Sequence, residues 1–104
     1  MVNSLAVREI ALDPTGRLMV HPSEAASSFQ FIYRAGNGLR WEPGSSAFVA
    51  AEPERWEAPE LLLHIVRTVR EELGAALHLT AQTQWVNVSE HMELQLRKAF
   101  EGGT

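Results

Sequence analysis

The sequence has no cysteine among its 104 residues. This absence excludes disulfide bonds, thiolate metal sites and thiol nucleophiles, and it removes the commonest signature of a small secreted domain. Long apolar runs are also missing, because none approaches the roughly 20 residues that span a bilayer. The first residues lack the basic and apolar regions of a signal peptide. We therefore expect a soluble, cytoplasmic protein that does not contact a membrane.

Cationic residues are sparse. The net charge is −4, the only lysine is Lys98, and the only adjacent basic pair is Arg97-Lys98. Nucleic-acid binding needs clustered Lys and Arg, so we predict no nucleic-acid partner. The hydrophobic content of 45% and charged content of 21% are typical of globular chains. We expect one globular domain over residues 1–104, with residues 101–104 as a frayed tail.

Two β-hairpins are predicted in the first half of the chain. Asp13-Pro14-Thr15-Gly16 is a turn sequence inside an apolar segment, which predicts a hairpin over residues 6–21. Residues 39–42 and 47–51 flank the turn 43–46 and predict a second one. Between them, residues 23–35 have helical spacing, with Ser23 as N-cap and Gly36 at the end. The alternative is a hairpin that turns at Asn37-Gly38.

The strongest helix signal covers residues 58–73. Glu57 is the expected N-cap, Trp56 and Leu61 are placed to form a hydrophobic staple, and Gly74 ends the helix. Apolar residues recur along one stripe, while His64 lies opposite it and is expected to be solvated. Because Leu61 and Leu63 flank the stripe, the sequence predicts a second contact surface on this helix.

Residues 77–79 and 85–88 alternate like strands, and Ser89 can cap a last helix. The predicted order is ββ-α-ββ-α-ββ-α. The expected fold class is α+β, with a mostly antiparallel sheet built from hairpins and helices packed on one face.

No reactive constellation is recognisable. The four histidines, His21, His64, His78 and His91, lack the spacing of a metal site, and Gly44-Ser45-Ser46 lies in a turn. We therefore predict no catalytic residues, no metal and no cofactor. A small enzyme with an acid–base pocket between sheet and helices is an alternative, for which the candidates are Tyr33, His78 and Glu42.

Large apolar and aromatic side chains are the feature left unassigned. If the valines of residues 85–88 face the helices, Trp85 lies on the other face of the sheet and needs a cover. The candidates for a ligand site or an interface are Tyr33, Trp41, Leu61, Leu63, Trp85 and Asn87. A separate acidic patch contains Glu52, Glu54, Glu57 and Glu60. An acidic patch of this kind suits an immunity or antitoxin-like protein that binds a basic partner.

Several short strings are similar to those of the small proteins encoded by integron gene cassettes. They are Phe31-Ile32-Tyr33-Arg34-Ala35, Leu39-Arg40-Trp41-Glu42-Pro43, His64-Ile65-Val66, Leu79-Thr80 and Trp85-Val86-Asn87-Val88. The resemblance implies a mobile, accessory bacterial gene and a compact, possibly self-associating α+β fold. It supplies no active-site residues. The sequence as a whole favours a non-enzymatic small-molecule- or protein-binding module that forms a homodimer.

Overall fold

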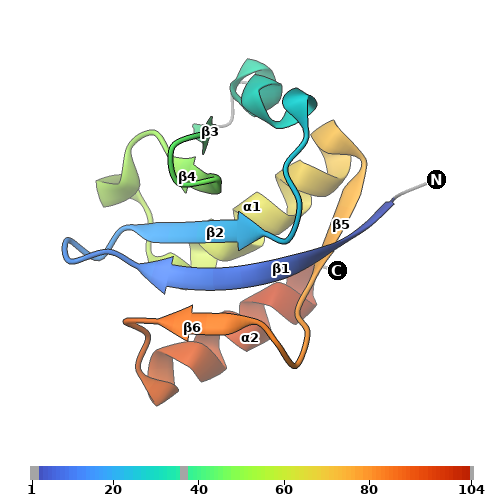
Figure 1. Cartoon of the computed structure of the whole chain (residues 1–104). Coiled ribbons are helices and arrows are strands. Elements are labelled where there is room, and N and C mark those ends of the chain that lie inside the picture. Colours follow the sequence, from blue (N-terminus) through green and yellow to red (C-terminus); the bar gives the residue numbers. More distant parts are fainter. Residues whose placement is uncertain (1–2, 36–37, 104) are drawn as a thin grey trace.

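The computed structural model describes residues 3–35 and 38–103 (Figure 1). The elements in chain order are β1 (Asn3–Leu12), β2 (Leu18–Pro22), the 3₁₀ helix η1 (Ser27–Ala35), β3 (Leu39–Glu42), β4 (Ala47–Ala50), the 3₁₀ helix η2 (Pro53–Arg55), α1 (Ala58–Leu73), β5 (Ala75–His78), β6 (Gln84–Val86) and α2 (Glu90–Gly103). Strand pairs alternate with helices, which confirms the predicted α+β class. No helix within the described ranges has the length and apolar character needed to cross a membrane.

The sheet has the order β3-β4-β2-β1-β5, with β6 also paired to β1. The pairings among β1, β2, β3 and β4 are antiparallel, so both hairpins predicted in the first half are confirmed. The last two strands differ from the expected hairpin, because β5 and β6 each pair with β1 in parallel. Both lie along the same edge of β1 (Figure 1). Residues 79–83 therefore connect two strands that run in the same direction, and they do not form a hairpin turn.

Thr83 joins the chain to β1 between β5 and β6. Its hydroxyl donates to the Val7 carbonyl at 2.8 Å and accepts from the Thr80 amide at 2.9 Å. The Val7 carbonyl lies beside a register shift in β1, between Val7 and Glu9. Thr83 is buried, so its hydroxyl satisfies a carbonyl that regular sheet pairing leaves out at a bulge.

The turn between β1 and β2 is held by Asp13. Its Oδ1 accepts hydrogen bonds from the Thr15 hydroxyl, the Thr15 amide and the Arg17 amide, at 2.6, 2.9 and 2.8 Å. Gly16 has φ +87°, a conformation that glycine adopts without steric cost. The turn that the sequence predicts at residues 13–16 is therefore formed by the expected side-chain and backbone chemistry.

These hydrogen bonds make the turn sensitive to acid. The Thr15 hydroxyl, followed by the Arg17 amide, holds the pKa of Asp13 below its ordinary value, because both stabilise the ionised carboxyl. A pKa that is lower in the folded chain means that the carboxylate stabilises the fold above about pH 4. This stabilisation is lost as the pH falls through the folded value. We expect Asp13→Asn to lower the melting temperature at pH 7 and to lessen its dependence on pH between roughly pH 5 and pH 2.

Thermal melts followed by circular dichroism at several pH values test this expectation. Glu24→Gln, at an exposed carboxylate outside the turn, is the matched control. Parallel melting profiles for wild type and Asp13→Asn across the acid range would contradict the assignment.

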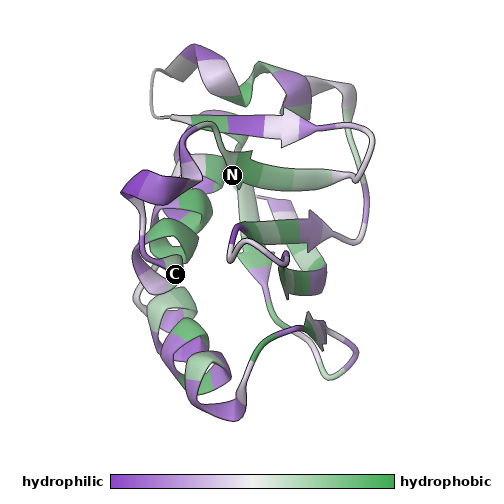
Figure 2. Cartoon of the chain, turned by 90° about the vertical axis from the view of Figure 1, so that its left-hand side faces the viewer, coloured by the Kyte–Doolittle hydropathy of each residue, from purple (hydrophilic) through white to green (hydrophobic). Residues whose placement is uncertain are grey.

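The helices and the strands form two layers. Figure 2 shows α1 and α2 on one side and the strands on the other. The core between them contains Leu5, Val7, Ile10, Leu18, Val20, Phe29, Ile32, Leu39, Phe48, Ala50, Leu61, Leu62, Ile65, Val66, Val69, Ala75, Leu77, Leu96 and Phe100. All four residues of β4 are buried, so this strand is covered on both of its faces. β1, β2 and β6 lie in front of the helices in Figure 1.

Helix α1 begins and ends where the sequence predicts. Gly74 has the left-handed conformation, with φ 65°, and its amide bonds to the Arg70 carbonyl. Glu57 is the N-cap residue but makes no side-chain cap hydrogen bond. The Trp56 ring stacks on His64 with the ring centroids 4.7 Å apart, so His64 is half-buried and not solvated as expected.

The segment over residues 23–35 is helical, as favoured, but it is a shorter helix of a different kind. It begins at Ser27, so Ser23 is not its N-cap. Residues 27–35 are helical and not a strand, which rules out the alternative hairpin. The predicted helix end at Gly36 and the first residue of the Asn37-Gly38 turn lie outside the described residues. At the other end of the chain, α2 extends through Gly103 and includes most of the expected tail.

Candidate functional site

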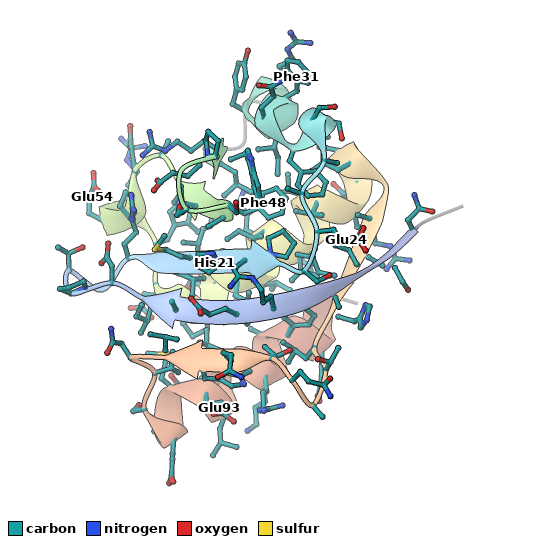
Figure 3. All side chains as sticks on the ribbon, viewed as in Figure 1. His21, Glu24, Phe31, Phe48, Glu54 and Glu93 are labelled. Atoms are coloured by element: carbon teal, nitrogen blue, oxygen red, sulfur yellow. The ribbon has the colours of Figure 1, made fainter. Side chains whose placement is uncertain are left out.

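Two large aromatic side chains project from η1. Phe31 is 41% exposed and Tyr33 is 57% exposed. The Arg34 guanidinium carbon lies 4.3 Å from the centre of the Phe31 ring, a cation–π distance. Phe31 projects away from the core residue Phe48 (Figure 3). We call Phe31, Tyr33 and Arg34 the η1 aromatic surface.

The geometry of the 3₁₀ helix explains why these residues face outward. With three residues per turn, positions i and i+3 share a face. Phe29 and Ile32 form the buried face, at 6% and 1% exposure. Phe31 and Arg34 share a second face, and Tyr33 lies on the third. The α-helical spacing assumed from the sequence instead groups Tyr33 with Ile32 on the buried side.

Trp41 and Trp85, two of the predicted interface residues, pack against the core. Trp41 is half-buried, and its ring centroid lies 5.2 Å from that of Phe29 and 4.8 Å from that of Phe48. Trp85 pairs with the buried Ile10 on the helix side of the sheet, and Arg97 of α2 covers its ring at 4.9 Å. The prediction that Trp85 could lie uncovered on the other face of the sheet is therefore wrong.

The end of β6 shows why the alternation rule failed there. Asn87 has φ 58° and donates from Nδ2 to the Leu12 carbonyl at 3.2 Å. Asn tolerates this left-handed conformation better than most residues. The turn at Asn87 breaks the strand alternation, so Trp85 and Val88 both pack on the core. Val86 is left on the other face, 39% exposed.

The two flanking leucines of α1 are also covered. Leu61 is 2% exposed and belongs to the core. Leu63 is half-buried and lies beside Gly102 of α2. A Cβ built on Gly102 would lie 3.9 Å from the Leu63 Cδ1, an ordinary van der Waals distance. The wide apolar face of α1 that the sequence indicates is thus explained by the packing of α2 against α1.

The predicted acidic residues gather around η2 and the start of α1. Glu52, Glu54, Glu57 and Glu60 are all exposed. Arg55 pairs with Glu52. Figure 3 shows Glu54 on a different side of the molecule from Phe31. A groove of about 360 Å³ next to Glu54 is lined by Thr15, Gly16, Arg17, Pro53 and Trp56.

A chain of polar contacts links the first hairpin to the turn after β3. His21 is 6% exposed; its Nδ1 lies 2.9 Å from the Ser45 carbonyl oxygen, and its Nε2 lies 3.4 Å from Glu9 Oε2. Ser45 Oγ donates to Glu42 Oε1 at 3.0 Å. Arg17 Nη2 lies 3.5 Å from Glu42 Oε2. These contacts fix the turn at residues 43–46 against β2.

The same contacts do not form a serine–histidine pair. A carbonyl oxygen only accepts, so Nδ1 of His21 carries the hydrogen that bonds to it. The hydroxyl hydrogen of Ser45 points to Glu42 and away from the imidazole. Activation of a serine nucleophile needs the base to accept that hydrogen. His21 is therefore not placed to take the hydrogen of Ser45.

The proposed acid–base residues do not converge. Tyr33 lies on η1, while Glu42 and His78 lie on β3 and β5, the two ends of the sheet order. Within residues 3–35 and 38–103, no three His, Asp or Glu side chains gather closely enough to hold a metal ion.

Sequence reasoning missed the contact of His21 with Glu9, and it missed Phe31. The first was recoverable, because a hairpin that turns at residues 13–16 pairs Leu12 with Leu18 and hence places residue 9 opposite residue 21. Phe31 was recoverable as well, because a helix that buries Phe29 and Ile32 leaves Phe31 on the opposite side even at 3.6 residues per turn. Only the exposure of Tyr33 depends on the helix being 3₁₀.

Comparison with known proteins returned one informative similarity. No protein-family model matches the sequence, and no curated protein is significantly similar to it. The solved structure of the integron cassette protein Hfx_Cass5, from the mobile metagenome of the North West Arm sewage outfall, is 29% identical to this chain. The match covers 97% of this chain and 99% of the other, with a TM-score of 0.46. The predicted resemblance is thereby confirmed: over nearly its whole length, the chain is similar to an integron cassette protein.

Proposed function

We propose that this chain is a non-enzymatic protein-binding module whose partner docks on the η1 aromatic surface. The observation that carries the proposal is the joint exposure of Phe31 and Tyr33 beside Arg34. Tyr and Arg are enriched among the residues that dominate binding energy at protein interfaces, and phenylalanine is enriched at interface cores. Folding alone gives no reason to expose two such rings.

The shape of the surface favours a protein over a small molecule. Small ligands bind in concave pockets that bury most of their surface. Phe31 projects from η1 (Figure 3), and neither Phe31 nor Tyr33 lines the two grooves next to η1 that residues 3–35 and 38–103 form among themselves. Projecting aromatic side chains suit a partner that supplies the pocket. We place this binding in the bacterial cytoplasm, consistent with a cysteine-free chain.

The structure gives less support to a catalytic function. Tyr33, Glu42 and His78 lie on separate elements, and Ser45 donates its hydrogen to a carboxylate. The acidic residues near η2 offer a second docking surface for a basic protein. The experiment below separates this alternative from the η1 aromatic surface.

Site-specific photo-crosslinking tests the proposal. Benzoylphenylalanine is introduced at Tyr33, at Glu54 or at Arg67, an exposed control position on α1. The variants are expressed in living bacteria that also contain the natural chain. We expect a discrete adduct from position 33 that is lost when Phe31→Ala is added, and none from position 67. Equal labelling at 33 and 67, or an adduct from position 54 alone, would overturn the proposal.

A further inference from the structure

Arg34 and Arg97 each lie against an aromatic ring, and they differ in what else they contact. The Arg97 guanidinium carbon lies 4.9 Å from the centre of the Trp85 ring, and its Nε lies 2.9 Å from Glu93 Oε2. One guanidinium therefore holds a ring and a carboxylate at the same time. Arg34 has the ring contact, with Phe31 at 4.3 Å. No carboxylate in the described part of the chain lies within ion-pair distance of it.

The sequence around Arg34 explains this difference. On α2, Glu93 precedes Arg97 by four positions, which is the spacing of an ion pair along a helix. Residues 25–41, which include all of η1, contain no Asp or Glu. The next carboxylate along the chain, Glu42, already contacts two arginines and a serine. A carboxylate for Arg34 therefore has to come from another molecule.

The Arg34 guanidinium is open to such a contact. Its side chain is exposed and lies in the last turn of η1. A guanidinium is planar, so its face can stack on a ring while the N–H donors along its edge bind a carboxylate. The contact with Phe31 also restricts the arginine side chain before a partner arrives, so less conformational entropy is lost on binding.

We propose that the partner of the η1 aromatic surface presents an Asp or Glu carboxylate to Arg34, at the rim of the pocket that receives Phe31. This inference rests on the proposed function and adds the chemistry of the partner. A carboxylate accepts two parallel N–H bonds from one arginine, which fixes the orientation of the two molecules. A partner with an aromatic-binding pocket but no carboxylate leaves these donors unpaired, so Arg34 contributes to specificity.

Substitutions at Arg34, made in the chain that carries benzoylphenylalanine at position 33, test the contact in living bacteria. Arg34→Gln removes the charge and is expected to lower the yield of the adduct at least tenfold. Arg34→Lys keeps the charge but cannot form the paired bonds, so it is expected to retain part of the yield. Arg67→Gln removes an exposed charge from α1 and is the matched control, with an unchanged yield expected.

A charge swap separates a direct contact of Arg34 from an effect through the Phe31 ring. Mass spectrometry of the adduct identifies the partner segment that lies against position 33. Arg34→Glu is expected to abolish the adduct with the natural partner, because two carboxylates then face each other. Replacing one Asp or Glu of that segment by lysine is expected to restore it. A purely structural role of Arg34 predicts no such recovery.

The outcomes distinguish this inference from the proposed function. If the adduct is unchanged in Arg34→Gln but lost in Phe31→Ala, the carboxylate contact is wrong and the aromatic docking surface stands. A partner segment without Asp or Glu, or a set of lysine substitutions none of which restores the adduct, leads to the same conclusion. If position 33 gives no adduct in the chain with natural Arg34, the proposed function is wrong, and this inference fails with it.

Discussion

Phe48→Ala is expected to cost about 3–5 kcal/mol of unfolding free energy, the range for large aromatic side chains removed from a core. Phe48 is 0% exposed. Its ring centroid lies 5.2 Å from that of Phe29 and 4.8 Å from that of Trp41, in tilted and edge-on contacts. The substitution removes the ring that joins η1 to the β3–β4 hairpin. Urea unfolding followed by circular dichroism measures the loss.

Phe31→Ala is the control for this prediction, because it removes the same side chain from an exposed position on η1. We expect it to change stability by no more than about 0.5 kcal/mol. Since Phe48→Ala removes a large share of a typical stability of about 5–15 kcal/mol, Phe48→Leu serves as a milder test with a smaller loss in the same direction. Equal stability of the Phe31 and Phe48 variants would refute the assignment of the aromatic cluster as core.

Thr83→Val is expected to cost about 1–3 kcal/mol, the penalty for leaving a buried polar group unsatisfied. Valine has the shape of threonine but cannot donate to the Val7 carbonyl or accept from the Thr80 amide. Both backbone groups then lack the partner that holds residues 80–83 against β1. Hydrogen exchange in β6 should accelerate, because this connection positions the strand.

Thr83→Ser keeps the hydroxyl and removes only a methyl group, so it separates the hydrogen bonds from the packing. We expect the serine variant to retain most of the wild-type stability and exchange protection. If serine and valine at position 83 destabilise the fold equally, the hydroxyl is not what joins this connection to β1.

Local signals made much of the fold predictable. Asp13 and Gly16 specify their turn through contacts within the turn itself. Helix α1 likewise depends on Gly74 and on its own apolar stripe. For the candidate site, the same reasoning selected Tyr33, which remains exposed. It also selected Trp41, Leu61, Leu63 and Trp85, which are wholly or partly covered by other parts of the chain.

The packing of distant segments decided the rest. The sequence predicts that the face of α1 is too wide for one contact, but the packing of α2 against Leu63 appears only in the folded chain. Strand alternation over residues 85–88 allowed either Trp85 or the valines to face the helices. The turn at Asn87, which bonds to the distant Leu12 carbonyl, places both Trp85 and Val88 on the core.

The sequence by itself determined the α+β class, both hairpins and α1, because each depends on residues a few positions apart. The tertiary structure decided the direction of β5 and β6, since both are set by pairing with β1, and by the Thr83 hydrogen bond to Val7. It also decided which aromatic side chains are exposed. Phe29 and Ile32 pack into the core at a spacing of three residues, and that spacing turns Tyr33 outward, whereas α-helical spacing would group it with Ile32.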